Sequence, residues 1–298
     1  MTATPRIGFI GLGNMGRGMA INLATKGFAV TAFDRDESRA RIVEQRGATR
    51  ATSVAALVAA AEIVVTMLPD TPDVAGVHDE LMRTGRAGQL HLDTSTIDPA
   101  ASRRMAEQLA AKGIARVDAG TGRGPAQAER GESLFMVGAS DADLARVRPL
   151  LEAMGNKVIH CGPPGSGIAM KIVNNYLAMA TVQVTAEAFT LGAKLGLPTR
   201  TMFEVITSSL ASNDHLKTYW PTKVLVGDVE PGFAIDLAFK DLSIGVAAAG
   251  GAGVPVPAGA AAREAFALAR SGHKLGARDV TAILVAAARS AGIKPPKL

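Results

Sequence analysis

The sequence predicts an α/β fold in which an N-terminal, doubly wound parallel sheet is followed by an all-helical C-terminal domain. The chain has 298 residues, which at roughly 150 residues per domain indicates two domains. In the first half, strand-sized apolar runs alternate with helical patterns, as in parallel sheets. In the second half, apolar helical stretches follow one another and the β-type alternation does not return.

The N-terminal elements come in regular order. Short apolar runs predict strands at 6–10, 29–33, 63–67, 90–93, 115–118 and 134–137. Between most of them, apolar residues recur at helical spacing, which predicts helices at 15–26, 37–46, 54–61, 99–112 and 141–154. This order favours a sheet that carries helices on both faces.

A strong breaker separates the two halves. The run 158–161 is a candidate for one more strand, and the sequence GPPG follows at 162–165. From about 166 to 195 apolar residues dominate without proline, which predicts one helix of roughly 40 Å. Further helices are expected at 200–209, 236–249, 259–271 and 279–291. We therefore expect a sheet domain at 1–163 and a helical domain at 164–298, joined by the long helix.

Composition argues against several classes of protein. The single cysteine, Cys161, excludes an internal disulfide and a cysteine-clustered metal site, and no histidine lies in an H-E-x-x-H motif. Lys and Arg number 32 against 27 Asp and Glu, but they are scattered rather than gathered in a basic run. The longest uncharged stretch is interrupted by Gly and Pro. We expect a soluble, cytoplasmic protein without a metal, a nucleic-acid partner or a membrane segment.

A glycine-rich turn follows the first expected strand. Gly11, Gly13 and Gly16 form G-x-G-x-x-G between a strand and a helix. The first glycine permits a tight turn, the second lets a pyrophosphate approach the backbone, and the third lets the helix pack on its strand. Asp34 ends the second strand, where a carboxylate binds the adenosine ribose hydroxyls and favours NAD. Arg35 follows it and makes NADP less favoured rather than excluded; the alternative is a glycine turn without a nucleotide.

Two more loops are expected at the carboxyl ends of strands, where open α/β sheets bind ligands. The first contains Leu68 and Pro69, and the second contains Ser95 and Thr96. Both also fit ordinary turn chemistry, in which Pro fixes φ and Ser or Thr caps the next helix.

The long helix begins with an unusual group of polar residues. Lys171, Asn174 and Asn175 share one helical face within an otherwise apolar segment. Either they serve a site, or the lysine extends to solvent and the asparagines bond to loop carbonyls.

Four ordered motifs together resemble the β-hydroxyacid dehydrogenase family, whose type member is 3-hydroxyisobutyrate dehydrogenase. They are GLGNMGRGM at 11–19, DTST at 93–96, GIAMKIVNN at 167–175 and PGFAIDLAFKDL at 231–242. The match covers essentially the whole chain. It implies a Rossmann domain, an active site between the domains, and a homodimer or homotetramer.

The resemblance also implies roles for single residues. Lys171 is expected to be the catalytic acid/base, with Asn175 holding the substrate oxygen and Asn174 as a polar contact nearby. Lys240 is expected to contact the cofactor. The other expected cofactor residues line the pyrophosphate, the adenosine ribose or the nicotinamide; they are Gly11, Leu12, Gly13, Asn14, Met15, Gly16, Asp34, Arg35, Leu68, Pro69 and Thr96.

The substrate loop departs from the common family pattern. Most members have D-A-P-V-S-G-G where this chain has DAGTGRG at 118–124, so Gly122 and Arg123 replace the serine and the first glycine. An arginine here resembles the 3-sulfolactaldehyde reductase branch, although Gly124 replaces a hydroxyl-bearing residue of that branch. Arginine's planar fork suits an oxyanion. The expected substrate site therefore contains Gly122, Arg123, Gly124, Thr96, Asn174 and Asn175.

The resulting functional hypothesis is an NAD-dependent oxidoreductase acting on a short anionic aldehyde, such as 3-sulfolactaldehyde, and its hydroxy counterpart. Activity on 3-hydroxyisobutyrate-like acids, on 4-hydroxybutyrate and succinic semialdehyde, on tartronate semialdehyde or on a phosphonate stays open, because Arg123 alone does not distinguish these anions. Arg123 could also be a solvated loop residue or a salt-bridge partner of Glu129 or Glu132. A non-catalytic nucleotide sensor is the alternative from another class.

Overall fold

The computed structural model describes residues 4–298, which form two compact units. The first unit ends at Lys171 and the second comprises Ile172–Leu298, so the division between these compact units falls inside the long helix α8 (Ser166–Lys194). That helix has 29 residues and agrees closely with the one expected at about 166–195.

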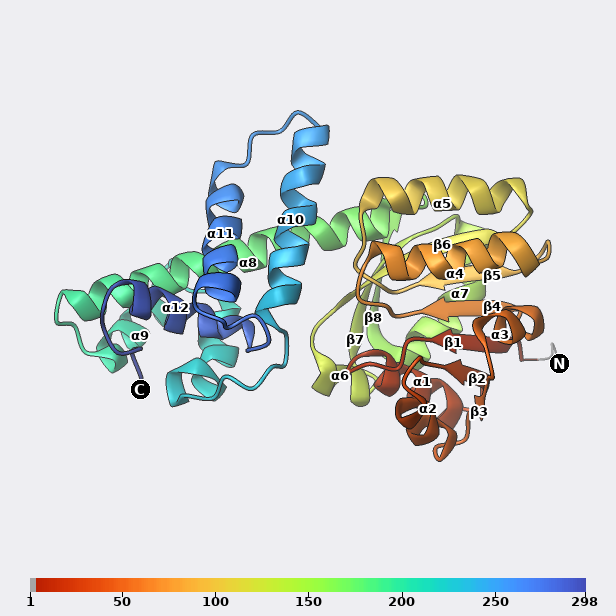
Figure 1. Cartoon of the computed structure of the whole chain (residues 1–298), viewed down its shortest axis with the longest axis horizontal. Helices are drawn as coiled ribbons and strands as arrows, with labels where there is room; N and C mark the ends of the chain where they lie inside the picture. Colours follow the sequence, from red (N-terminus) through yellow and green to blue (C-terminus); the bar gives the residue numbers. More distant parts are fainter. Residues whose placement is uncertain (1–3) are drawn as a thin grey trace. The chain divides into compact units, whose positions relative to one another are not determined.

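The first unit contains an eight-stranded sheet in the order β3-β2-β1-β4-β5-β6-β7-β8 (Figure 1). From β3 to β6 this is the order of a doubly wound Rossmann sheet, which reverses direction between β1 and β4. The strands are β1 (Arg6–Ile10), β2 (Ala29–Phe33), β3 (Thr49–Arg50), β4 (Ile63–Thr66), β5 (Leu90–Asp93), β6 (Ala115–Gly122), β7 (Ser133–Gly138) and β8 (Gly155–Gly162). The sequence does not predict β3, because two exposed residues form no pattern.

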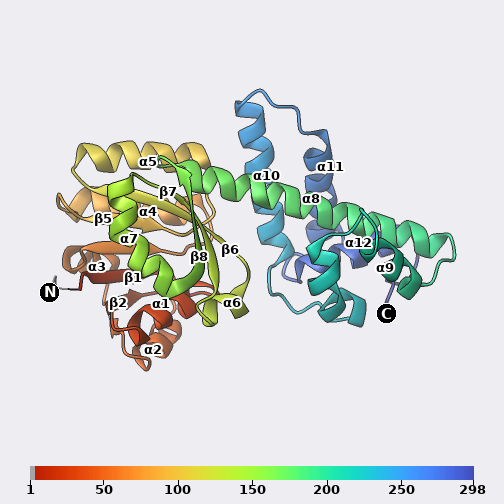
Figure 2. The same ribbon diagram turned by 180° about the vertical axis from the view of Figure 1, so that it is seen from behind.

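One junction departs from the expected parallel sheet. β7 runs antiparallel to β6, with Asp118 opposite Gly138 and Gly122 opposite Leu134. The connection between them contains only the five-residue helix α6 (Pro125–Glu129), whereas a parallel crossover needs about a dozen residues or more. β8 then pairs parallel to β7 (Figure 2).

Helices cover both faces of the sheet because strand side chains alternate between them. Ile7 and Phe9 of β1 lie in one buried cluster with residues of α1 (Gly16–Thr25), α2 (Glu37–Glu44) and α7 (Asp141–Met154). Ile10 lies in a second cluster with residues of α3 (Val54–Ala60), α4 (Thr71–Thr84) and α5 (Pro99–Ala111).

Local sequence explains where these helices begin. Asp36, Ser53, Asp98 and Ser140 each accept a main-chain N–H with a side-chain oxygen at a helix start. The sequence does not predict α4, since Pro72 and Gly76 interrupt its pattern. In the structure Pro72 lies in the first turn, where its missing N–H is harmless.

The second unit is helical, as expected. It contains most of α8 together with α9 (Thr199–Thr207), α10 (Ile235–Gly251), α11 (Pro257–Ala267) and α12 (Ile283–Ser290). Trp220 is fully buried at its centre, with ring centroids 5.8 Å from Phe189. Short turns of other helix types complete the unit: η1 (His215–Tyr219), η2 (Trp220–Thr222), η3 (Val224–Val226), η4 (Leu268–Gly272) and η5 (Val280–Ala282).

Tyr176 joins α8 and α11 within this unit. Its hydroxyl accepts the N–H of Gly259 at 3.1 Å. A Cβ at Gly259 would lie 1.9 Å from Cε2 of Tyr176, so no side chain fits there while the tyrosine stays in place.

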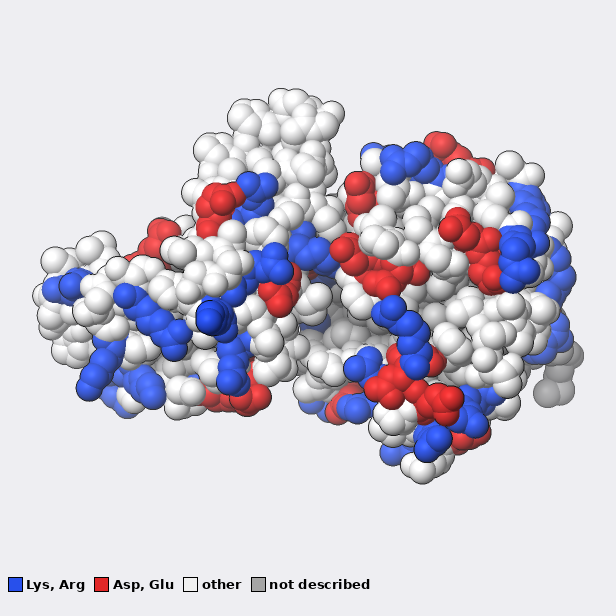
Figure 3. Space-filling view, viewed as in Figure 1, with Lys and Arg blue, Asp and Glu red and all other residues white. Residues whose placement is uncertain are grey.

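The surface of the first unit mixes charges of both signs. On the face drawn in Figure 3, lysine and arginine side chains are interspersed with aspartate and glutamate. No helix in residues 4–298 has the length and apolar character needed to cross a membrane.

Candidate active site

The glycine turn between β1 and α1 has the shape that a dinucleotide needs. Gly11 has φ +95°, and a Cβ there would lie 2.3 Å from the carbonyl oxygen of Met67. A Cβ at Gly16 would lie 2.0 Å from the carbonyl oxygen of Gly11. These two glycines are therefore required by the chain's own packing.

Gly13 differs from them because its surroundings are open. Apart from its chain neighbours, the only described atom within 4 Å of a Cβ at Gly13 would be Nη1 of Arg39, at 3.8 Å. The turn thus leaves room for a pyrophosphate beside the first turn of α1, whose main-chain N–H groups favour an anion. Asn14 is exposed and Met15 half-buried, whereas Leu12 is 1 % exposed and belongs to the core. Leu12 therefore offers its main chain rather than its side chain.

Asp34 lies where the adenosine ribose is expected. Its Oδ2 accepts the N–H of Leu12 at 2.6 Å and its Oδ1 accepts the N–H of Asp36 at 2.9 Å. These bonds orient the carboxylate against the glycine turn. Arg35 lies outside, with its side chain 83 % exposed and paired to Oδ1 of Asp73 at 3.4 Å.

The two loops after β4 and β5 are tied together. Oγ of Ser95 accepts the N–H of Leu68 at 2.9 Å. Neither Ser95 nor Thr96 caps the next helix, because Asp98 does so by accepting the N–H groups of Ala100 and Ala101. Leu68 and Thr96 are half-buried, and Pro69 is exposed.

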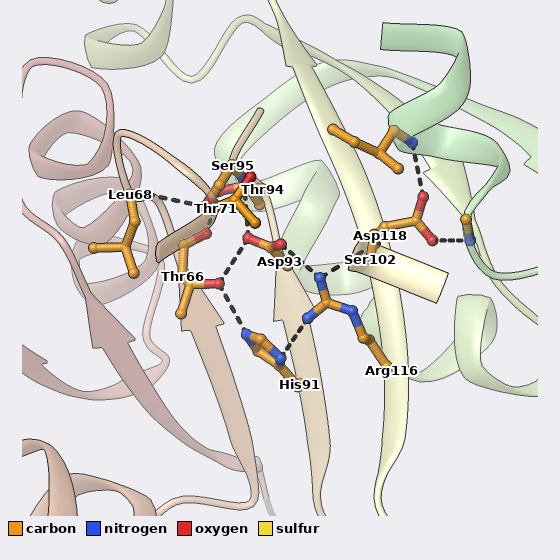
Figure 4. Close-up of polar contacts among 12 residues, drawn as sticks. Thr66, Leu68, Thr71, His91, Asp93, Thr94, Ser95, Ser102, Arg116 and Asp118 are labelled. Atoms are coloured by element: carbon orange, nitrogen blue, oxygen red, sulfur yellow. Dashed lines mark hydrogen bonds and ion pairs between the residues drawn. The ribbon is translucent and has the colours of Figure 1, made fainter. Parts of the chain in front are cut away.

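Beneath these loops lies a buried polar cluster that the sequence did not reveal (Figure 4). Nη2 of Arg116 is 2.7 Å from Oδ2 of Asp93, and its Nη1 is 2.7 Å from Nδ1 of His91. Burial alone would raise the pKa of Asp93, but the Arg116 charge and the hydrogen bonds hold that pKa below its ordinary value. The apolar patterns around His91 and Arg116 predict strands, but they do not indicate that these two side chains contact each other.

The segment expected to bind the substrate, 118–124, comprises the end of β6 and the two residues that follow it. Arg123 is exposed and has φ +70°, a left-handed conformation. Its Nη1 donates to the carbonyl oxygen of Glu132 and, at 2.6 Å, to Oδ1 of Asn156. The expected alternative of a salt bridge to Glu129 or Glu132 is not what is found, since Arg17 and Arg130 pair with those carboxylates. Gly122 is buried, and Gly124 precedes α6 as its N-cap.

Lys171 is held against β6 within the first unit. It is 9 % exposed, so it does not extend freely to solvent. A Cβ at Gly120 would lie 2.6 Å from Cβ of Lys171 and 3.2 Å from the carbonyl oxygen of Gly167. The glycine in β6 thus permits the close approach of α8.

Asp118 fixes the start of that helix. Its Oδ1 accepts the N–H of Gly165 at 2.5 Å, and its Oδ2 accepts the N–H of Ile168 at 2.7 Å. Burial raises the pKa of Asp118, and these two N–H groups partly offset the rise. The carboxylate therefore determines where α8 begins relative to β6.

A second group of expected residues gathers in the helical unit. Nδ2 of Asn175 donates to Oδ2 of Asp241 at 2.6 Å, and Nζ of Lys240 lies 3.1 Å from Oδ1 of the same carboxylate. Asn174 is exposed and donates to Oδ1 of Asn175 at 3.1 Å. The sequence gave Asp241 no role, although it links Asn175 to Lys240. Lys171 and Asn175 lie one turn apart along α8.

Within residues 4–298, no group of His, Cys, Asp and Glu side chains has the arrangement of a metal site. The chemistry of the described site is that of a dinucleotide turn and an amine. Asp34 places a carboxylate beside the turn where the adenosine ribose is expected, and the surroundings of Gly13 are open; these features fit NAD.

Comparison with known proteins agrees with this geometry. Residues 6–162 match the family model described as the NAD binding domain of 6-phosphogluconate dehydrogenase. Residues 165–287 match the model described as "NAD-binding of NADP-dependent 3-hydroxyisobutyrate dehydrogenase".

Individual relatives cover nearly the whole chain. A 3-sulfolactaldehyde reductase of Escherichia coli (strain K12) is 38% identical over 290 residues, which are 96% of this chain and 97% of the relative. A 2-(hydroxymethyl)glutarate dehydrogenase of Eubacterium barkeri is 37% identical over 287 residues, 95% of each chain. The structure of Mycobacterium tuberculosis 3-hydroxyisobutyrate dehydrogenase with L-serine superposes with a TM-score of 0.88 at 32% identity, covering 95% of this chain and 99% of that one.

The turn, the carboxylate at the end of β2 and these full-length matches lead to one conclusion. The chain belongs to the β-hydroxyacid dehydrogenase family and is an NAD-dependent oxidoreductase that acts on CH–OH groups.

Proposed function

We propose that this enzyme interconverts a short aldehyde bearing a strong anion and the corresponding hydroxy compound, with Lys171 as the acid/base. The best candidate pair is 3-sulfolactaldehyde and 2,3-dihydroxypropane-1-sulfonate. The observation that carries the acid/base role is the buried Lys171, packed against Gly120 of β6. The substrate is suggested by Arg123 and by the 38% identity to the E. coli relative named for 3-sulfolactaldehyde.

The cofactor is proposed to lie along the glycine turn. Gly11, Gly13 and Gly16 shape the pyrophosphate site, and Asp34 binds the adenosine ribose. Leu68, Pro69 and Thr96 face the nicotinamide half, and Lys240 approaches its ribose. NADH is preferred to NADPH because Asp34 would repel a 2′-phosphate, and Arg35 is engaged by Asp73.

The chain's own residues supply the proton. When bound, NADH provides the hydride that reduces the carbonyl carbon. The carbonyl oxygen then becomes an alkoxide, and the ammonium of Lys171 protonates it; in the oxidative direction the neutral amine takes the proton from the hydroxyl. Asn175 holds the substrate oxygen, and its amide is itself oriented by Asp241.

Lys171→Ala tests this role. We expect turnover to fall at least about 100-fold, the usual contribution of acid–base catalysis, while NADH still binds. Turnover like that of the wild type in this variant would refute the acid/base assignment. Loss of NADH binding as well would mean that the residue serves the cofactor site.

Arg123 is the proposed anion anchor. Both hydrogen bonds that the described residues give it use Nη1, so its Nε–Nη2 edge is the one that would receive an oxyanion. The test compares kcat/KM for matched sulfonate, phosphonate and carboxylate aldehydes in the wild type and in Arg123→Ala. We expect a loss of roughly 30- to 1,000-fold, mainly on the preferred anion. An equal loss on a neutral aldehyde would refute the anchor, and a carboxylate preference would favour a 3-hydroxyisobutyrate-like or succinic semialdehyde activity.

We also propose a cytoplasmic homodimer or homotetramer. Four apolar side chains of α8 in the helical unit, Val173, Leu177, Val184 and Leu191, are 60% or more exposed. Leu177, Val184 and Leu191 recur every seven residues and so share one side of the helix. A monomer in light scattering at micromolar concentration would contradict the assembly.

A further inference from the structure

Four buried side chains form a closed ring beneath the two loops after β4 and β5 (Figure 4). They come from three adjacent strands: Thr66 from β4, His91 and Asp93 from β5, and Arg116 from β6. Arg116 contacts Asp93 and His91 as described above. Oγ1 of Thr66 completes the ring at 2.9 Å from Nε2 of His91 and 2.8 Å from Oδ1 of Asp93.

Each proton of this ring has one possible place. A guanidinium only donates, so Nδ1 of His91 must accept from Arg116. Burial is the main cause that lowers the pKa of His91 to about 3, and the charge of Arg116 adds to it. The His91 imidazole is therefore neutral and carries its hydrogen on Nε2. That hydrogen goes to Oγ1 of Thr66, and the hydroxyl hydrogen of Thr66 therefore goes to Asp93.

The ring is connected to both loops above it. Oδ1 of Asp93 also accepts the N–H of Ser95 at 3.1 Å. Ser95 in turn accepts the N–H of Leu68, and the hydroxyl of Thr94 donates to the carbonyl oxygen of Thr66 at 2.7 Å. The Asp93 carboxylate is thus linked by hydrogen bonds to Ser95 in one loop and, through Ser95, to Leu68 in the other.

We infer that Arg116 is a positioning residue for the nicotinamide half of the site, acting through the Asp93 carboxylate on the loops that carry Leu68 and Thr96. Replacing a buried ion pair by apolar residues is often neutral or stabilising, so stability alone does not account for a charged pair here. The planar guanidinium bonds Asp93 and His91 with two different nitrogens, which fixes the carboxylate in rotation. The inference rests on the proposed contact of these loops with the nicotinamide.

Arg116→Lys tests this inference, because lysine keeps the charge but not the two-pronged geometry. NADH binding is measured by fluorescence titration, and ADP-ribose, which lacks the nicotinamide, by competition. We expect the NADH dissociation constant to rise about tenfold, as for the loss of one good interaction, and that of ADP-ribose to stay within about twofold. Thr66→Val removes the hydroxyl that closes the ring but keeps the ring's charge and the side chain's shape. It should likewise raise the dissociation constant of NADH and leave that of ADP-ribose nearly unchanged.

Arg86→Lys is the matched control. Arg86 donates to the carbonyl oxygens of Ala59 and Ala61, away from the ring, so this variant should bind both ligands like the wild type. If Arg116→Lys and Thr66→Val weaken NADH and ADP-ribose equally, or neither, the positioning role is refuted. The proposed contact between these loops and the nicotinamide is tested separately, in the wild-type enzyme. It is refuted if the wild type binds NADH no more tightly than ADP-ribose.

Discussion

Gly120→Ala should displace Lys171, the proposed acid/base, while leaving the glycine turn between β1 and α1 unchanged. The added Cβ would lie 2.6 Å from Cβ of Lys171, whereas ordinary carbon contacts are about 3.5–4.0 Å. Cβ of Lys171 is fixed to its helix and cannot rotate away, so α8 and β6 must separate by about 1 Å. A misplacement of about 1 Å at a reacting group can cost about 100-fold in rate. We therefore expect kcat to fall by about that factor.

The assay is steady-state turnover with NADH and the preferred aldehyde, accompanied by NADH titration. The dissociation constant of NADH should stay near that of the wild type, because the glycine turn is unchanged. Gly76→Ala in α4 is the matched control: nothing lies within 4 Å of its added Cβ, so activity should be unaffected. A Gly120→Ala enzyme with wild-type kcat would refute the argument that this close approach positions Lys171.

Three further predictions concern other parts of the molecule. Asp34→Ala should weaken the binding of NADH more than that of NADPH, because one hydrogen-bonding group for the ribose is lost. Titration with both cofactors should show the ratio of the NADH to the NADPH binding constant falling about tenfold. The pKa of His91 is lowered from 6.5 to about 3 in the folded chain, so its contribution to stability is complete above pH 6.5 and is lost as the pH falls toward 3. Urea unfolding should therefore show the free energy of unfolding falling by up to about 1.4 kcal/mol per pH unit below 6.5, with a smaller slope in His91→Gln. Asp241→Ala removes the acceptor of the Asn175 amide and should lower kcat/KM about tenfold or more, with the fold intact by circular dichroism.

The sequence predicts the local elements of the sheet well, because their signals are local. Apolar runs at 6–10, 29–33 and 90–93 coincide with β1, β2 and β5, and the glycine turn follows β1 as expected. The prediction that β7 runs parallel to its neighbour β6 was wrong. The direction of a strand depends on the length of the connection that precedes it, here with only the short helix α6, and not on the strand's own pattern.

The candidate site divides in the same way. Gly11, Gly13, Gly16 and Asp34 form a motif within one βαβ unit, and the structure brings them together. The ring around Arg116 was not predictable, because its bonds to His91 and Asp93 join residues 25 and 23 positions apart on neighbouring strands. In the sequence, Thr66, His91 and Arg116 are single polar residues inside apolar runs, and Asp93 opens the polar DTST motif without pointing to the other three. Only the register of β5 against β6 puts His91 beside Arg116.

The contact between Tyr176 and Gly259 has a consequence for how this sequence can vary. Replacing a helical glycine by alanine ordinarily stabilises a protein by up to about 1 kcal/mol. At position 259 the added Cβ would lie 1.9 Å from Cε2 of Tyr176, so alanine is tolerated there only if a smaller residue has already replaced Tyr176. Tyr176 directly follows Asn175, and shrinking it would also remove the hydroxyl that receives the N–H of Gly259. Natural drift or laboratory evolution should therefore change these two positions as a pair, and a single step at either one should be selected against.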